Sequence, residues 1–235
     1  MTTASLPIQT KRASRQRRPV DIWHSEPEDL YALAEQLRGR PVPGVRMTEA
    51  QFEQWSDEDL RAEWVDGEII IMAPVSDTHD DLNNWFSTLL RMYVEEHDLG
   101  IIRTNMNLRF STQRRWRCPD LFFIARDRQH LMHPTYFDGA PDLAIEFVSP
   151  DSQSRDRRDK FKEYEKAGVR EYWIIDPLSK TVELYRLERK RFQAVEDANG
   201  ILASSVLPKF RIKPEQLWRK PLPKVSTVLR QLAQK

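Results

Sequence analysis

Two acidic residues lie within apolar segments that have the character of β-strands. Asp120 follows Pro119 in the segment 117–124, and Glu146 lies inside the segment 143–148. An ionised carboxylate is costly to bury in an apolar strand unless it is paired or binds a metal. Carboxylate oxygens suit Mg²⁺ or Mn²⁺, which usually take one or two protein carboxylates and keep several waters. The pair therefore indicates a divalent-metal site; for each acid alone, a partnered carboxylate at a strand end is the alternative.

A cation is needed to complete such a site, because phosphodiester hydrolysis uses a metal-activated water and a positive group near the attacked phosphate. A lysine two residues after Glu146 would share its strand face, but that position is Val148. Lys160 lies near the start of the next predicted helix, which folds back over the sheet. We expect Lys160 to reach the carboxylates from the helix surface, so that truncating it changes the free energy of unfolding by under about 0.5 kcal/mol. An ordinary exposed lysine is the alternative.

The elements that must position these residues follow from hydrophobic periodicity and turn signals. The strong apolar stripe of the helix that begins at Thr78 is expected to form core. Further helices are predicted over 26–37, from Thr48 as N-cap, over 57–64 and over 155–167, with Gly168 as C-cap. Strands are predicted over 68–72, 100–104, 108–110, 117–125, 142–148, 171–175, 181–187 and 192–195, with a turn at Asn199-Gly200. This order predicts an α/β or α+β fold with a mixed central sheet flanked by helices, in which 142–176 forms a strand–helix–strand crossover.

Several short motifs occur in an order that resembles a known family. The matching stretches are 63–69, 72–79, 118–121, 144–151, Lys160 with Tyr164, and 167–177. Each is weak alone, but their order and spacing, which end in Gly-Val-Arg-Glu-Tyr-Trp-Ile-Ile-Asp-Pro, are specific. From about Met47 to Trp218 the chain resembles the Uma-type family of restriction endonucleases within the PD-(D/E)XK nuclease superfamily.

The resemblance implies a restriction-endonuclease-like core and a catalytic site. Asp120 and Glu146 would lie on adjacent strands and hold Mg²⁺ or Mn²⁺, with the backbone carbonyl of Val148 as a third ligand. Lys160 would face them from the helix and stabilise the attacking water or the charged phosphate.

Two further residues enter the site through the resemblance alone. Glu63, expected on the first core helix, would bind or orient the metal. His79 would reach the same cleft from the first turn of the next helix as an accessory residue. A half-exposed histidine at a helix start is the alternative for His79.

The function implied is metal-dependent hydrolysis of DNA phosphodiester bonds. DNA is the expected partner, and a homodimer is plausible because duplex cleavage uses two sites. A catalytically silent nuclease-fold module that binds DNA or a protein partner is the alternative. The sequence contains neither Gly-x-Ser-x-Gly nor the P-loop motif, which argues against acyl hydrolases and P-loop NTPases. The basic residues expected to line the DNA path are Arg103, Arg114, Arg115 and Arg117.

Composition limits the class of protein and its environment. The 235 residues are 40% hydrophobic and 31% charged with a net charge of +1, so a basic surface must be local. The single cysteine, Cys118, fits a reducing compartment, and no apolar run is long enough to span a membrane. We therefore expect a cytoplasmic protein with no membrane partner. Its expected parts are a basic, partly disordered N-terminal arm with a short helix (1–45), the nuclease-like domain (46–222) and a C-terminal tail (223–235).

Overall fold

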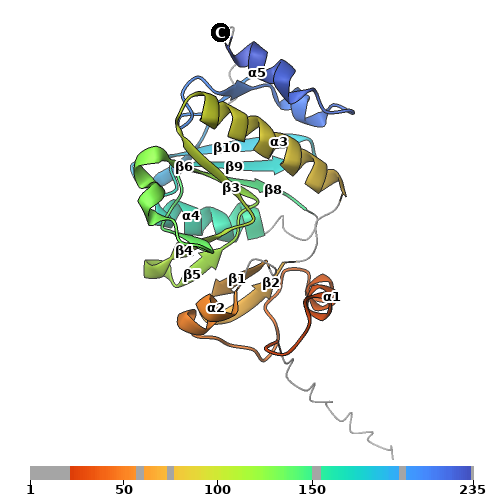
Figure 1. The fold of residues 1–235 in the computed structure, drawn as a ribbon, viewed down its shortest axis with the longest axis vertical. Helices are drawn as coiled ribbons and strands as arrows, with labels where there is room; N and C mark the ends of the chain where they lie inside the picture. The colour runs from red at the N-terminus through yellow and green to blue at the C-terminus, as the bar shows by residue number, and fades with distance from the viewer. Residues whose placement is uncertain (1–21, 57–60, 73–76, 150–154, 196–199, 234–235) are drawn as a thin grey trace, which may run out of the picture.

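The described residues form two large β-sheets with helices packed outside them, and β12 and β13 pair as a third, two-stranded sheet (Figure 1). The computed structural model describes residues 22–56, 61–72, 77–149, 155–195 and 200–233. The strands are β1 (Ala62–Val65), β2 (Glu68–Ile71), β3 (Gly100–Thr104), β4 (Asn107–Phe110), β5 (Arg115–Arg117), β6 (Leu121–Ala125), β7 (Tyr136–Asp138), β8 (Leu143–Phe147), β9 (Glu171–Asp176), β10 (Thr181–Glu188), β11 (Arg191–Ala194), β12 (Leu202–Ala203) and β13 (Arg211–Ile212).

Helices follow the hydrophobic periodicity of the sequence. The α-helices are α1 (Pro27–Leu37), α2 (Glu49–Trp55), α3 (Asp77–Glu96), α4 (Phe161–Ala167) and α5 (Val225–Ala233). Shorter 3₁₀ segments are η1 (Ser111–Gln113), η2 (Arg126–Leu131) and η4 (Pro214–Trp218), and η3 (Arg155–Lys160) is a π-helix that leads into α4. The capping box of Thr48 and Gln51 begins α2, and Gly168 ends α4 with φ 93°, as predicted.

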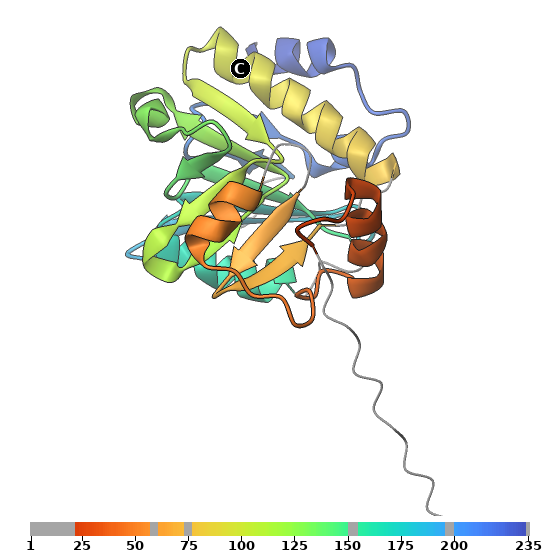
Figure 2. The same cartoon turned by 60° about the horizontal axis from the view of Figure 1, so that its bottom comes forward.

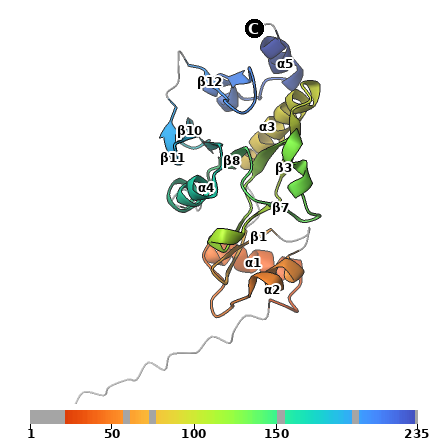
Figure 3. The ribbon, with the colours of Figure 1, turned by 90° about the vertical axis from the view of Figure 1, so that its left-hand side faces the viewer.

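The six-stranded sheet has the order β11-β10-β9-β8-β6-β3 and is mixed, because only β8 and β9 run parallel. Helices α3 and α4 lie on opposite faces of this sheet (Figures 1 and 3). Alternate residues of β8 enter the two clusters of buried side chains: Leu143, Ile145 and Phe147 pack on the α3 side, and Ala144 packs on the α4 side. The predicted α+β class, the mixed sheet flanked by helices and the crossover from β8 through α4 to β9 are therefore confirmed.

The five-stranded sheet has the order β2-β1-β5-β4-β7 and carries the N-terminal helices (Figure 2). Ile22, Leu30 and Val42 are buried in one cluster with Trp64 and Trp116. The compact part of the chain therefore reaches back to Ile22, into the segment 1–45 that was expected to be an arm. The basic segment before it lies outside the described residues.

Three predicted elements differ in the structure. The helix predicted over 57–64 is wrong for its last residues, since Ala62–Val65 is strand β1, and residues 57–60 lie outside the described residues. The single strand predicted over 117–125 is two strands in different sheets, β5 and β6, because the chain crosses between the sheets at Cys118–Asp120. The helix predicted over 155–167 begins as the π-helix η3. Of the predicted turn at Asn199-Gly200, Asn199 lies outside the described residues.

The C-terminal segment expected as a tail forms helix α5, which runs beside α3 (Figures 1 and 2). Val228 is buried, and Val225, Leu229 and Leu232 pack against the same core cluster as α3. Their spacing of three and four residues is that of an amphipathic helix. None of the helices described is both long enough and apolar enough to cross a membrane.

Candidate active site

The two predicted acids come together where the chain passes from one sheet to the other. Asp120 immediately precedes β6, and the antiparallel register pairs Leu121 of β6 with Ile145 of β8. Continuing that register places Asp120 opposite Glu146. The backbone N–H of Phe147 donates a hydrogen bond to Oδ2 of Asp120 at 2.8 Å, which closes this end of the strand pair.

Glu146 is buried against two donors from the helix that crosses behind β8. Nζ of Lys160 lies 2.9 Å from Oε1 of Glu146, and the hydroxyl of Tyr164 donates to the same oxygen at 2.8 Å. Lys160 and Tyr164 are four residues apart and so share one face of the helical segment. The Lys160 side chain is only 1% exposed. The expectation of a lysine on the helix surface is therefore wrong, because the chain folds the π-helical turn over the carboxylates.

Asp120 is held ionised by its neighbours. Burial alone would raise the pKa of Asp120, but a hydrogen bond from His79 and the positive charges of His79, Arg61 and Lys160 lower it to about 2. NH2 of Arg61 lies 3.3 Å from Oδ1 of Asp120, and Nε2 of His79 lies 3.4 Å from Oδ2. The carboxylate is therefore charged throughout the neutral pH range.

His79 is buried at the first turn of α3, as the resemblance implied. Its Nε2 donates to the carbonyl of Phe147 at 3.1 Å, since a carbonyl oxygen only accepts. Burial lowers the pKa of His79, but the hydrogen bond and the negative charge of Asp120 outweigh burial and raise it. Nδ1 is also buried and has no hydrogen-bond partner among the described residues. The alternative of a half-exposed histidine is wrong.

Glu63 lies on strand β1 and not on a helix, which corrects the expected position. The register of β1 with β5 pairs Trp64 with Trp116, so Glu63 faces Arg117 across the strands. Oε2 of Glu63 accepts from Arg117 at 2.6 Å, and Oε1 accepts from the backbone N–H of Cys118 at 3.3 Å. Nζ of Lys160 lies 3.3 Å from the same Oε1. Glu63 therefore connects the five-stranded sheet to Lys160.

The four arginines expected on a DNA path have different environments. Arg117 is 3% exposed and bonds both Glu63 and Glu163, so it cannot contact DNA, and that expectation is wrong. Arg115 is half-buried and pairs with Asp66 and Glu163.

No ion pair with a described residue is found for the other two arginines. Arg114 is exposed, with its guanidinium 5.9 Å from the centre of the Trp64 ring. Arg103 is partly exposed on β3, the edge strand of the six-stranded sheet. Of the four arginines expected to line a DNA path, only Arg117 is therefore excluded by burial.

The remaining predicted ligand is the backbone of Val148. Its N–H donates to the carbonyl of Ile175 at 2.8 Å, and its side chain packs beside Tyr164 on the α4 side of the sheet. Within the described residues, no group of three or more His, Cys, Asp or Glu side chains is placed to hold a metal ion. Asp120, Glu146 and Glu63 each contact a basic side chain of the chain itself.

Three residues of this network were not predicted as site residues from the sequence. Tyr164 was noted only as part of a motif, although its spacing from Lys160 places both on one helix face. Arg61 precedes Glu63 by two residues, and Glu163 clamps Arg117 through two hydrogen bonds of 2.6 and 2.9 Å. Single charged residues at these positions carry no local signal that separates them from a solvated surface.

Comparison with known proteins identifies the family of the chain. A family model described as "Uma2: Putative restriction endonuclease" matches residues 49–215. Two uncharacterised proteins of Synechocystis sp. (strain ATCC 27184 / PCC 6803 / Kazusa) are similar to the chain. One, slr1290, is 25% identical over 148 residues, covering 61% of this chain and 76% of that protein. The other, sll1609, is 26% identical over 142 residues, covering 60% of this chain and 80% of that protein.

A solved structure shares the fold. The crystal structure of a putative nuclease belonging to DUF820 from Anabaena variabilis ATCC 29413 matches with a TM-score of 0.62 at 18% identity, covering 73% of this chain and 97% of that chain. Because the family model covers more than half of the sequence, the chain belongs to the Uma2 family of putative restriction endonucleases.

Proposed function

We propose that the chain is a metal-dependent endonuclease that hydrolyses DNA phosphodiester bonds at the site formed by Asp120, Glu146 and Lys160. The observation that carries this proposal is the juxtaposition itself. Asp120, which immediately precedes β6, lies opposite Glu146 of β8 when the strand register is continued, and a buried ammonium group lies 2.9 Å from Glu146. Membership of a nuclease family supports the same chemistry.

The donor set fits Mg²⁺ or Mn²⁺ by its chemistry. Asp120 is ionised because its pKa is about 2, and carboxylate oxygens are the ligands these ions prefer. Two carboxylates suffice for Mg²⁺, which keeps several waters. We propose Asp120 and Glu146 as the ligands, together with the carbonyl of Val148. The bound ion would supply a water of lowered pKa as the nucleophile.

The chain's own residues then have distinct roles. Lys160 supplies the positive charge that stabilises the negative charge developing on the attacked phosphate. Glu63 orients Lys160, since its Oε1 lies 3.3 Å from Nζ, and Arg117 fixes Glu63 from the opposite side. His79 holds Asp120 and the end of β8 together through contacts with Asp120 and Phe147. Glu63 and His79 are thus proposed as positioning residues.

Cleavage of supercoiled plasmid DNA with Mg²⁺ or Mn²⁺ tests this proposal. Asp120→Asn and Glu146→Gln should each lower the cleavage rate by at least about 10²-fold, because each removes a charge at the reacting centre. Asp142→Asn is the matched control. Asp142 is also a buried acid next to β8, but it bonds the backbone N–H of Ala125 at 2.9 Å at the other end of the strand. Equal loss in all three variants would contradict the assignment.

The second candidate, a catalytically silent module, is separated by the same assay. Wild-type protein that binds DNA and cleaves none under either metal would favour that module. We further propose a twofold dimer, since cutting both strands of a duplex uses two sites. We also propose a cytoplasmic location. Sedimentation at micromolar concentration tests the dimer.

A further inference from the structure

Positive charge is concentrated at the C-terminal end of the chain. Residues 201–235 contain eight Lys and Arg side chains and a single acidic residue, Glu215, whereas the whole chain has a net charge of +1. The rest of the protein therefore carries an excess of acidic side chains. A second concentration of positive charge, besides the basic N-terminal segment, therefore lies in residues 201–235, and the family match ends at residue 215, within it.

The structure leaves these cations available at the surface. Seven of these eight Lys and Arg residues lie among the described residues, and none of the seven forms an ion pair with a described residue. Arg109, Arg115 and Arg157, by contrast, bond carboxylates elsewhere. All seven are exposed except Arg211, which is partly exposed. They are Lys209, Arg211, Lys213, Arg219, Lys220, Lys224 and Arg230.

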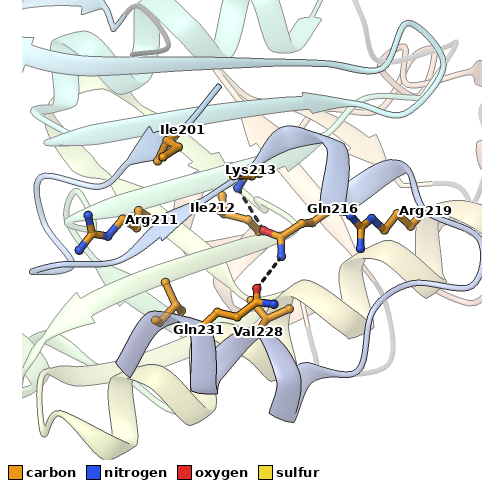
Figure 4. Close-up of a pocket in the computed structure, with 9 residues that line it drawn as sticks. Ile201, Arg211, Ile212, Lys213, Gln216, Arg219, Val228 and Gln231 are labelled. Atoms are coloured by element: carbon orange, nitrogen blue, oxygen red, sulfur yellow. Dashed lines mark hydrogen bonds between the residues drawn. The ribbon is translucent and has the colours of Figure 1, made fainter. Parts of the chain in front are cut away.

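Part of this surface is hollowed. A depression of about 430 Å³ lies between β13, η4 and α5, and Arg211, Lys213 and Arg219 line it together with Gln216 and Gln231. Figure 4 shows Arg211 and Arg219 at opposite ends of the hollow and the two glutamine amides between them. The lining therefore offers donors and positive charge to an elongated anion.

We propose that the seven cations of residues 209–230, three of which line this hollow, form a cationic surface that binds the phosphate backbone of duplex nucleic acid. Ammonium, guanidinium and amide groups spread along a surface are the groups that contact phosphates. The side chains that line the hollow include no aromatic ring on which unpaired bases could stack, which favours a duplex over a single strand.

An anionic membrane fits this surface less well. A helix that inserts into a lipid surface needs a free apolar face. Here the apolar face of α5 is used within the protein, because Val228 is buried in the core and Leu229 packs against it. Only the polar and basic face of α5 is left for an external partner.

The surface adjoins the helix that carries part of the candidate active site. Nε1 of Trp85 donates to the carbonyl of Pro223 at 2.6 Å, which ties the segment before α5 to the third turn of α3. His79 lies six residues earlier on the same helix, a rise of about 9 Å. A duplex held on the cationic surface thus lies alongside the helix whose first turn reaches Asp120.

Binding can be measured without cleavage. Fluorescence anisotropy with a labelled 30-base-pair duplex in EDTA, at a series of salt concentrations, gives both affinity and salt dependence. The test variant is Lys213→Gln/Arg219→Gln/Lys224→Gln. The matched control is Lys180→Gln/Arg189→Gln/Lys190→Gln, which removes three exposed cations from the turns that flank β10. Circular dichroism and melting temperature verify that both variants fold.

We expect the test variant to bind at least about tenfold more weakly at 0.1 M salt, with the slope of log K against log salt reduced by about 2.7 for three lost phosphate contacts. The control variant should match the wild type. An unchanged slope in a folded test variant overturns the proposal. So does a variant that loses binding to vesicles of phosphatidylserine and phosphatidylcholine while keeping DNA affinity. Because the assay contains no metal, it tests this binding even if the protein cleaves no DNA.

Discussion

The burial of Lys160 leads to a prediction that distinguishes a buried, ion-paired lysine from an exposed one. Lys160→Met keeps most of the apolar stem and removes the ammonium group. The variant leaves Glu146 and Glu63, with side chains 4% and 0% exposed, without their shared cation. Removing one partner of a buried ion pair costs about 3–5 kcal/mol, because the other charge stays buried.

The expected loss lies at the lower end of that range. Glu146 keeps the hydrogen bond from Tyr164, and Glu63 keeps Arg117 at 2.6 Å. We therefore expect the free energy of unfolding to fall by about 3 kcal/mol at pH 7. At pH 5 the loss should be smaller, since protonation of the stranded carboxylates removes buried charge.

Urea denaturation of wild type and variant at both pH values measures these differences. A double variant, Lys160→Met/Glu146→Gln, supplies the coupling term. It should be less destabilised than the sum of its single changes, by about 1–3 kcal/mol, because the carboxamide needs no counter-charge. A loss under about 0.5 kcal/mol at both pH values, the value expected for a surface lysine, would refute the buried geometry.

Three further predictions follow from the same network. The pKa of Asp120 is lowered from 3.8 to about 2, so ionised Asp120 contributes on the order of 2 kcal/mol to the free energy of unfolding. This contribution is present above about pH 4 and is lost as the pH falls toward 2. Asp120→Asn should therefore reduce the fall in stability at acid pH, as measured by urea denaturation. Mn²⁺ or Mg²⁺ should raise the melting temperature of wild type more than that of Glu146→Gln, since an ion bound only by the native state stabilises it; equal shifts would place the ion elsewhere. Arg117→Met should lower the free energy of unfolding by about 3 kcal/mol, because Glu63 is left buried without its cation. Adding Glu63→Gln to that variant should restore part of the lost free energy, as measured by calorimetry.

Local patterning in the sequence was sufficient for most of the elements. The stripe of α3, the apolar run of β8 and the capping box of α2 each depend on residues within a few positions of one another. Propensity and periodicity act at that range, so these elements were predicted with nearly the observed bounds. The acids Asp120 and Glu146 were identified for the same reason, since a charge in an apolar strand is visible without any long-range information.

Errors occurred where a local pattern was outweighed by pairing with distant strands. The segment before Val65 reads as a helix, but its pairing with β2 and β5 makes it strand β1 and turns Glu63 toward Arg117. The spacing of Val225, Val228 and Leu229 carried a helical signal that was read as a tail, and packing against α3 is what gives that helix a core to cover.

What only the tertiary structure decided is which charges are buried together. The sequence by itself determined that two acids interrupt apolar strands and that a lysine follows on a helix. Whether Lys160 meets solvent or two carboxylates depends on how the π-helical turn sits over β8, and whether Arg117 meets DNA or Glu63 depends on the register between β1 and β5. Burial is a property of the packed chain, because the solvent around a side chain is displaced by residues that lie far away in the sequence.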